Sequence, residues 1–485
     1  MKLEKILENI EYSLIKGALN TDIKSLVYDS RKVENGSLFV CLKGAKFDGH
    51  AYAKEVTENG AVALIVEDDV DESINAAVIK VKDSREALAL LSAAWFDYPA
   101  KKLTVIGITG TKGKTTTAHM IKSILESSGN KTGMIGTMGA YIGTEKKETK
   151  NTTPESYELH SLFDEMFRKG CKYVVMEASS QGFKMKRTYG IEFDYAMFLN
   201  ISPDHIGEGE HKDFEEYLFC KSIMFTQCKN AIANIDDERW KDVLNGYNGN
   251  LIGISTKCAS DVWTDKAENL WDSDKLGIKF NVHGLVERQF SLAMPGIFNV
   301  YNALMAVTVC NAIGIDCDSM QDGFDHVYVK GRTQLVKCAL PITTVIIDYA
   351  HNALSMEELL KMLKSYNPKR LICLFGGGGN KPKARRFDMG AMSGKYADLT
   401  VLTTDNPRFE EVDNINNEII EGINKYNGKY QIIKDREEAI KYLLDNATRD
   451  DIIALIGKGH EEYQDIKGVK YYFSEQEIIE DYMKG

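Results

Sequence analysis

A strand-like run, a glycine-rich turn and a helix-like segment follow one another early in the chain, and this succession constrains the fold more than any other feature. The apolar run LTVI leads into GITGTKGKTTT (residues 107–117) and then into AHMIKSILESSG. Gly110 and Gly113 would let the backbone turn tightly and direct its N–H groups at an anion. Lys114 would add positive charge, and the hydroxyl of Thr115 or Thr116 could bind a magnesium ion. The stretch therefore predicts a nucleotide-phosphate loop.

The glycine spacing departs from the common pattern of such loops. In G-x-x-x-x-G-K-[ST] the first glycine stands five residues before the second. Here that position is Ile108, and Gly107 comes one residue too early. Because a strand-like run precedes the turn and a helix-like segment follows it, we favour nucleotide binding over a glycine-rich surface loop.

Strand-like and helix-like segments alternate along the whole chain and predict an α/β fold. Apolar runs such as KYVVMEA, YAMFLNI and NAIANI are separated by amphipathic segments, which is typical of a parallel, doubly wound sheet. A chain of 485 residues is too long for one core, so about three domains are expected. We predict a small α/β domain at 1–99, a central P-loop ATPase domain with a mainly parallel sheet at 100–334, and a C-terminal Rossmann-like domain at 335–485.

Composition excludes several classes of protein. With 44% hydrophobic and 27% charged residues, the chain is an ordinary globular protein rather than a disordered one. Its net charge of −11 argues against a general nucleic-acid binder. None of its apolar runs reaches the ~20 residues of a membrane-spanning helix. The nine cysteines show no CxxC spacing, so we expect reduced thiols in a cytoplasmic protein.

Polar residues that follow the strand-like runs are candidates for chemistry, because ligands bind beyond the carboxyl ends of parallel strands. Glu177 closes the run YVVM, and His205 follows FLNISPD. Glu177 is a natural magnesium ligand, whereas an imidazole such as His205 is a less usual one. Lys221 lies in an amphipathic helix-like segment and predicts, by itself, only a surface lysine.

Further along, two loops and one helix start suggest small-molecule binding. Arg408 in DNPRFEE suits a carboxylate, while Asp405 and Glu461 suit an ammonium group. Together they indicate an amino-acid ligand, although two salt-bridged surface loops would have the same composition. Asn299 and Asn302 are spaced i, i+3 and share a helix face, where two amides could bind an adenine edge or cap the helix.

In their order along the chain, these motifs resemble those of the Mur ligases, ATP-dependent amino-acid ligases of peptidoglycan precursor synthesis. The motifs are YDSRKVENGSLFVCLKGAKFDGH, GTKGKTT, NTTPES, MEASSQG, NISPDH, PGIFNVYNAL, KGR, DYAHN, DNPRFEE and GKGHEEYQ. The shorter GTxGKT form of that family also accounts for the early glycine at Gly107. The likeness spans all three predicted domains, and it implies that residues 1–99 bind UDP, that 100–334 bind ATP and that 335–485 bind an amino acid.

The resemblance implies roles for the residues that match the family motifs. Those expected to act in catalysis are Lys114, Glu177, His205 and Lys221. The ATP site would comprise Gly110, Thr111, Lys112, Gly113, Lys114, Thr115, Thr116, Asn299, Asn302, Arg332 and Asp348. The UDP-MurNAc-dipeptide would meet Ser30, Ala45, Lys46, Phe47, Asn151, Thr152, Thr153, Ser179 and Arg187. The incoming amino acid would meet Lys381, Asp405, Asn406, Pro407, Arg408, Gly457 and Glu461. The metal ligands would be Thr115, Glu177, His205 and Lys221, the last as an N6-carboxylysine formed with CO2.

The implied reaction joins a diamino acid to the D-Glu of UDP-N-acetylmuramoyl-L-Ala-D-Glu. Mg²⁺ and Lys114 would neutralise the γ-phosphate of ATP while the D-Glu carboxylate attacks it. The amine of the diamino acid would then attack the resulting acyl phosphate. The partners are thus the UDP-linked dipeptide, a diamino acid and ATP, with no nucleic acid and no membrane insertion, and we expect a monomer.

The identity of the diamino acid depends on opposing features. In the family, DNPR is typical of meso-diaminopimelate ligases, because Arg408 can pair with a second carboxylate that L-lysine lacks. However, Lys381 replaces the usual arginine and loses its bidentate fork. The segment SPDHIGEGEHKDFEEY also resembles a branch that includes lysine-adding enzymes. We favour meso-diaminopimelate, with L-lysine as the alternative.

Other functions fit less well. A folylpolyglutamate synthetase would share the ATPase core but would lack a UDP-binding first domain. A different Mur-type ligase would not be expected to carry both DNPR and GKGHE. A non-catalytic nucleotide-binding paralogue should have lost catalytic positions, whereas Lys114, Glu177, His205 and Lys221 are all present.

Overall fold

The structure is a computed structural model that describes residues 1–485 except 45–46, 205, 208, 272–274, 341 and 485. The chain divides into two compact units, each described here by itself. The first comprises Met1–Ser255 and Met305–Asp316, and the second comprises Thr256–Leu304 and Cys317–Gly485. Among the described residues, no helix is both long and apolar enough to span a membrane.

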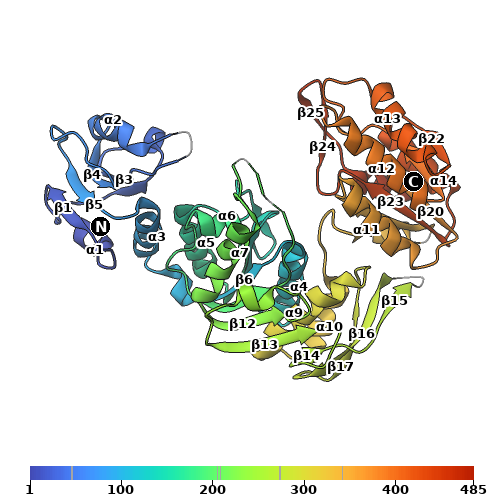
Figure 1. The fold of residues 1–485 in the computed structure, drawn as a ribbon, viewed down its shortest axis with the longest axis horizontal. Helices are drawn as coiled ribbons and strands as arrows, with labels where there is room; N and C mark the ends of the chain where they lie inside the picture. The colour runs from blue at the N-terminus through green and yellow to red at the C-terminus, as the bar shows by residue number, and fades with distance from the viewer. Residues whose placement is uncertain (45–46, 205, 208, 272–274, 341, 485) are drawn as a thin grey trace. The chain divides into compact units, whose positions relative to one another are not determined.

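The first unit begins with a five-stranded sheet (Figure 1). Its strand order is β1-β5-β4-β3-β2, and all pairs except β1 with β5 are parallel. The strands are β1 (Ser13–Lys16), β2 (Ser25–Val27), β3 (Ser37–Val40), β4 (Ala61–Val66) and β5 (Ala77–Lys80). The helices are α1 (Leu3–Ile6), α2 (Ala53–Glu58) and α3 (Ser84–Trp95). The side chain of Asp83 caps α3 by accepting two backbone hydrogen bonds, as expected of an N-cap aspartate.

The second sheet of this unit carries the glycine-rich loop. Within this unit, the strands of the sheet run in the order β9-β8-β7-β10-β6-β11-β12-β13. All are parallel except β8 and β9, so the prediction of a mainly parallel sheet is confirmed. The strands are β6 (Thr104–Thr109), β7 (Thr132–Gly136), β8 (Gly139–Ile142), β9 (Glu145–Lys147), β10 (Tyr173–Glu177), β11 (Phe193–Phe198), β12 (Cys228–Asn234) and β13 (Asn250–Ser255).

Helices cover this sheet and bury its apolar side chains. They are α4 (Lys114–Ser127), α5 (Ser156–Arg168), α6 (Ser180–Lys184), α7 (Phe214–Ser222) and α8 (Trp240–Val243). Figure 1 shows α5, α6 and α7 on one side of the strands, where residues such as Phe163, Phe193 and Tyr217 form a core cluster. In β6, Gly107 is required by packing, because a side chain there would collide with Met224 and Phe193.

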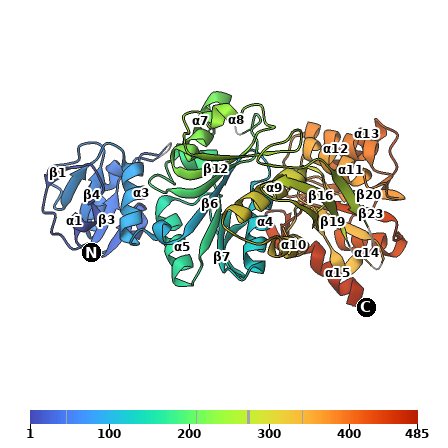
Figure 2. The same cartoon turned by 90° about the horizontal axis from the view of Figure 1, so that it is seen from below.

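The second unit is built on a six-stranded sheet with helices on both faces. The order is β18-β19-β23-β20-β21-β22, and only β18 is antiparallel. The strands are β18 (Gln334–Leu335), β19 (Thr344–Asp348), β20 (Arg370–Phe375), β21 (Leu399–Leu402), β22 (Tyr430–Ile432) and β23 (Asp451–Ile456). Helices α11 (Ala353–Lys364), α12 (Lys383–Tyr396) and α13 (Val412–Asn424) lie on one face, and α14 (Arg436–Asn446) and α15 (Glu475–Lys484) lie on the other (Figure 2). This is the predicted Rossmann-like arrangement.

Smaller elements complete the second unit. They are β14 (Val262–Trp263), β15 (Ala267–Trp271), β16 (Leu276–Gly284), β17 (Arg288–Leu292), α10 (Cys317–His326) and the hairpin β24 (Tyr463–Ile466) with β25 (Val469–Tyr472). Helix α9 (Phe298–Ala312) is divided between the two units after Leu304. The domain boundaries drawn from the sequence stay a prediction.

One buried histidine makes stability depend on pH. His160 on α5 is 1% exposed, and neither ring nitrogen has a hydrogen-bond partner in the described structure. Burial lowers its pKa from 6.5 to about 4. Between these values the unfolded chain binds a proton that the folded chain does not, so stability falls as the pH falls from 6.5 towards 4.

We therefore expect His160→Leu to flatten this dependence. Between pH 7 and pH 5, the wild type should lose on the order of 2 kcal/mol more unfolding free energy than the variant. Urea titrations at both pH values, followed by circular dichroism, measure the difference. Equal losses in the two proteins would show that His160 does not titrate as a buried neutral group.

Candidate active site

The glycine-rich loop joins the end of β6 to the start of α4. Gly110 and Gly113 adopt φ values of +157° and +90°, and the latter, in the left-handed region, favours glycine. The first turn of α4 therefore follows the loop directly, which is the arrangement that binds phosphate with backbone N–H groups. The Nζ of Lys114 donates to the carbonyl oxygens of Gly110 (2.7 Å) and Thr111 (3.0 Å).

Asn200 stabilises this loop through hydrogen bonds, a role that was not predicted from the sequence. Its backbone oxygen accepts from the N–H of Thr111 (2.9 Å), and its Oδ1 accepts from the N–H of Lys112 (2.9 Å). Its Nδ2 donates back to the oxygen of Lys112 at 3.1 Å. Asn200 lies just beyond β11, the neighbour of β6, so its strand-end position was the available signal.

Glu177 ends β10 beside the loop and is almost fully buried, at 2% exposure. Its Oε2 accepts from the hydroxyls of Thr115 (3.0 Å) and Thr137 (3.1 Å), and its Oε1 accepts from the backbone N–H of Thr137 (3.0 Å). The structure thus brings Glu177 together with Thr115, as predicted, whereas the contribution of Thr137 was not foreseen. His205, which was also predicted as a metal ligand, lies outside the described residues.

Lys221 is buried, at 1% exposure, so its interpretation from the sequence as a surface lysine is wrong. Its Nζ donates to the oxygen of Gly110 at 2.9 Å and lies 4.5 Å from the ring centroid of Tyr217. Burial, together with the positive charge of Lys114, holds the pKa of Lys221 well below its usual value. The helical pattern of α7 could not reveal this burial because Lys221 faces the phosphate loop rather than solvent.

Four of the five residues predicted to bind the muramoyl dipeptide are hydrogen-bonded to Glu177, or to Thr153 or Thr137 beside it. Thr153 donates to the backbone oxygen of Glu177 at 2.9 Å and lies 3.1 Å from the hydroxyl of Ser179. Arg187 donates to Glu155 (2.6 Å) and to the oxygen of Thr153 (3.1 Å). The Oγ1 of Thr152 lies 3.1 Å from that of Thr137. Asn151 is exposed on the same loop.

The predicted UDP-binding residues lie in the N-terminal sheet domain. Ser30 starts a single 3₁₀ turn, Ser30–Lys32, that is capped by the side chain of Asp29. Phe47 is 72% exposed, which is unusual for a large apolar side chain. Ala45 and Lys46 lie outside the described residues.

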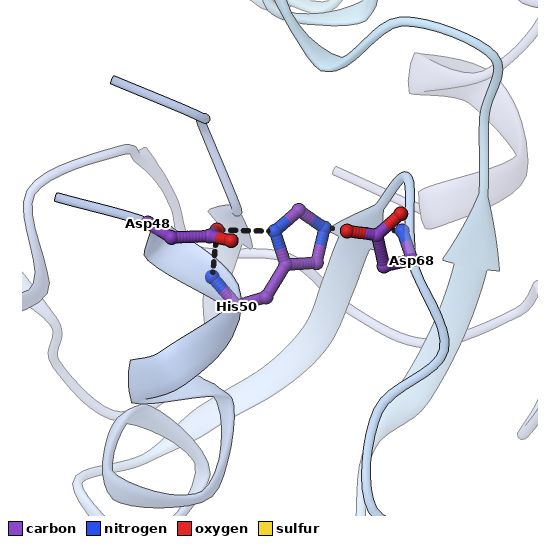
Figure 3. Close-up of side chains that lie close together, drawn as sticks. All are labelled: Asp48, His50 and Asp68. Atoms are coloured by element: carbon purple, nitrogen blue, oxygen red, sulfur yellow. Dashed lines mark hydrogen bonds and ion pairs between the residues drawn. The ribbon is translucent and has the colours of Figure 1, made fainter. Parts of the chain in front are cut away.

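Three residues whose side chains could hold a metal ion, Asp48, His50 and Asp68, lie close together near Phe47, and His50 forms hydrogen bonds within this group (Figure 3). The Nδ1 of His50 lies 2.6 Å from Asp48, and its Nε2 accepts from the backbone N–H groups of Glu67 (2.9 Å) and Asp68 (3.3 Å). Because Nε2 accepts, the ring proton belongs on Nδ1, which donates to Asp48. Both ring nitrogens of His50 are therefore hydrogen-bonded, and these bonds connect the loop at 48–50 to the end of β4.

In the second unit, Asn299 and Asn302 lie on one side of α9, as their spacing predicts. The Nδ2 of Asn302 donates to Oδ1 of Asn299 at 2.9 Å, and Asn299 donates to the oxygen of Pro295 at 2.7 Å. Arg332 lies over the ring of Tyr349, 5.5 Å from its centroid. The carboxylate of Asp348 accepts from the N–H of Thr333 at 2.6 Å, and burial raises its pKa.

A cavity of about 220 Å³ opens among the loops that follow β19, β20, β21 and β23. Six of the seven residues predicted to bind the amino acid line it, and only Pro407 does not. The lining is Tyr349, His351, Gly376, Gly377, Gly378, Lys381, Arg385, Arg386, Met389, Asp405, Asn406, Arg408, Gly457 and Glu461. A cavity at the carboxyl ends of parallel strands is the expected ligand position in such a sheet.

Arg408 is held at this cavity in an unusual backbone conformation, with φ of +52°. Its N–H donates to the oxygen of Asp465 at 2.9 Å, and its Nη1 donates to the oxygen of Gly379 at 3.0 Å. Its Nε lies 3.7 Å from the Asp465 carboxylate. Gly379 must be glycine, because a side chain there would collide with the oxygen of Pro407.

Asn406 connects the other loops around the cavity. Its Nδ2 donates to Glu461 at 2.9 Å, while its Oδ1 accepts from Lys458 (3.1 Å) and from the N–H of Asp465 (2.9 Å). Lys458 and Asp465 were not predicted from the sequence as supports of this loop. Lys458 falls within the GKGHE motif, which was its only signal.

Comparison with known proteins places the whole chain in one family. Residues 22–96 match the Mur ligase family catalytic domain, 108–310 the Mur ligase middle domain, and 331–459 the Mur ligase glutamate ligase domain. UDP-N-acetylmuramoyl-L-alanyl-D-glutamate–2,6-diaminopimelate ligases of Caldanaerobacter subterraneus subsp. tengcongensis and Clostridium perfringens are 41% and 38% identical. The alignments cover 99% and 100% of this chain and 98% and 100% of those proteins.

A solved structure of a ligase with the same name agrees in fold. It has a TM-score of 0.77 and 26% identity, and the match covers 100% of this chain and 99% of the other. The strand-end loops, the buried Glu177 and the cavity at Arg408 therefore occur in a chain that matches such ligases over its full length. The chain belongs to the Mur ligase family.

Proposed function

We propose that this ligase joins 2,6-diaminopimelate to the D-glutamate of UDP-N-acetylmuramoyl-L-alanyl-D-glutamate at the expense of ATP, in peptidoglycan precursor synthesis. The observation that carries the proposal is full-length similarity, at 41% and 38% identity, to relatives with that activity in their names. The cavity at Arg408, which combines cationic and anionic side chains, supports an amino-acid substrate of this kind.

The phosphate loop supplies the groups that ATP activation needs. The N–H groups at the start of α4 and the charge of Lys114 suit the outer phosphates. In phosphoryl transfer, a D-glutamate carboxylate oxygen attacks the γ-phosphorus as its bond to ADP breaks. The amine of the incoming amino acid then attacks the acyl carbon, and inorganic phosphate leaves with the carboxylate oxygen that it gained.

The residues around Glu177 fit a magnesium ion. Both oxygens of this buried carboxylate lie among hydroxyl and N–H donors, and the hydroxyl of Thr115 is adjacent, which is the oxygen-rich chemistry that Mg²⁺ prefers. When bound, Mg²⁺ would neutralise negative charge on the transferred phosphoryl group. We assign Thr115, Glu177, His205 and carboxylated Lys221 as its ligands.

Lys221 has the properties required for carboxylation. A lysine with a lowered pKa is largely a free amine, and its nitrogen lone pair can attack CO2. The nitrogen forms a bond to carbon and releases one proton, so the neutral amine becomes an anionic carbamate. Such an anion beside Lys114 would be stabilised by the same charge that now disfavours a second ammonium group.

The other predicted roles stay part of the proposal. Ser30, Ala45, Lys46 and Phe47 would contact UDP, and Asn151, Thr152, Thr153, Ser179 and Arg187 would contact the muramoyl dipeptide. Asn299, Asn302, Arg332 and Asp348 are assigned to the nucleotide. We also propose that the protein acts in the cytoplasm and as a monomer.

The amino-acid cavity can distinguish a second carboxylate. The Nη2 of Arg408 makes no hydrogen bond among the described residues, so this guanidinium can still pair with an anion. Lys381, Asp405 and Glu461 would serve the carboxylate and ammonium groups that all amino acids share. L-lysine lacks the second carboxylate that would pair with Arg408. It stays a second candidate substrate because Lys381 stands where the family usually has an arginine.

Phosphate release tests both the reaction and its specificity. With ATP and UDP-MurNAc-L-Ala-D-Glu, we expect release with meso-diaminopimelate and little with L-lysine. Arg408→Ala should lower kcat/KM for diaminopimelate by about 10- to 100-fold, because a charged pairing is lost, and should leave the low rate with lysine unchanged. Release with lysine alone would reassign the substrate, and release with neither amino acid would refute the ligase proposal.

Chemical rescue tests the role of Lys221. We expect Lys221→Ala to lose at least about 100-fold in kcat, because an anion that helps to place the metal is removed. Formate or acetate should restore part of this rate, whereas chloride at equal ionic strength should not. Full activity of Lys221→Ala without any added acid would contradict the carboxylated-lysine assignment.

A further inference from the structure

Thr137 is an exposed residue just after β7, yet its polar groups are directed at the buried Glu177. Its backbone N–H donates to Oε1 at 3.0 Å, and its hydroxyl donates to Oε2 at 3.1 Å. One residue thus contacts both oxygens of the carboxylate from one side. Thr115 adds only a single bond, to Oε2.

The preceding glycine makes this approach possible. A side chain at Gly136 would collide with Oε1 of Glu177. The carboxylate therefore lies directly against the backbone at 136–137, and β7 and β10 are paired up to Ile135 and Met176. The backbone at the end of β7 consequently restricts the side-chain torsion angles of Glu177 by direct contact.

The direction of the hydroxyl bonds follows from counting protons. A threonine hydroxyl has one proton, and an ionised carboxylate can only accept. Because Thr137 gives its proton to Glu177, the contact of 3.1 Å between Thr137 and Thr152 requires Thr152 to be the donor. The result is a directed chain from Thr152 through Thr137 to Glu177, in which each bond polarises the next.

We infer that Thr137 is a positioning residue that holds the Glu177 carboxylate in the orientation needed to bind the divalent cation. This inference rests on the proposed function, because it takes Glu177 to be a metal ligand. Groups that hydrogen-bond to a metal ligand orient it, and their loss weakens metal binding. Thr137 would also link Thr152, which belongs to the NTTPES motif, to the metal site.

Metal binding, rather than activity, provides the direct test. Mn²⁺ is titrated into the full-length protein without substrates, and the free ion is measured by electron paramagnetic resonance. Thr137→Val removes the hydroxyl, keeps the backbone N–H and changes an exposed position, so folding should be preserved. Thr132→Val is the matched control, because Thr132 lies at the other end of β7 and its hydroxyl bonds only to the oxygen of Asn130 among the described contacts.

We expect Thr137→Val to raise the Kd for Mn²⁺ by about three- to ten-fold, the effect of one lost hydrogen bond to a charged group. Thr137→Ser should restore the wild-type value within about two-fold, and Thr132→Val should bind like the wild type. If Thr137→Val melts at a lower temperature, Thr137→Ser still tests the inference, because serine restores the hydroxyl and so restores only an Mn²⁺ affinity that depends on it.

Two results would overturn the inference, and they are distinguishable. Equal Mn²⁺ affinity of the wild type and Thr137→Val would remove the positioning role while leaving the proposed function intact. Absence of Mn²⁺ binding by the wild type would remove the metal site itself, and with it this part of the proposed function.

Discussion

The carbonyl oxygen of Gly110 accepts hydrogen bonds from two lysines, and much of the site in the first unit depends on this convergence. Lys114 donates from 2.7 Å and Lys221 from 2.9 Å. Burial of Lys221, together with the positive charge of Lys114 on the same oxygen, lowers the pKa of Lys221. In the proposed function, an amine with a lowered pKa lies beside a cationic one, which favours the formation of a carbamate and then stabilises it.

The surrounding structure is organised to keep that convergence in place. Gly110 follows β6 directly, Lys221 comes from α7, and Asn200 fixes the intervening loop through both its backbone and its side chain. Glu177 approaches from the adjacent strand β10, where Thr137 and Thr115 hold its oxygens. In the second unit, four loops at the strand ends similarly assemble one cavity of mixed charge around Arg408. Both sites follow from the same property of parallel sheets, in which the carboxyl ends of neighbouring strands share an edge.

Local patterns in the sequence were sufficient to predict the features of the fold and of the sites that depend on strand ends. The α/β class, the phosphate loop, the position of Glu177 beside Thr115 and the clustering of Asp405, Arg408 and Glu461 could all be predicted in this way. Residues that act through tertiary contacts could not be. Thr137 and Asp465 have no distinctive local pattern, and the burial of Lys221 depends on a loop 111 residues away. The predicted roles of Ala45, Lys46 and His205 concern positions outside the described residues.

In the proposed function, this chain activates a D-glutamate carboxylate as an acyl phosphate. The most direct measurement uses UDP-MurNAc-L-Ala-D-Glu labelled with ¹⁸O in its D-glutamate carboxylates, turned over with ATP and meso-diaminopimelate. We expect each released phosphate to carry one ¹⁸O atom, because the attacking carboxylate oxygen leaves with the phosphorus. Unlabelled phosphate, formed at the same rate as the amide product, would contradict it.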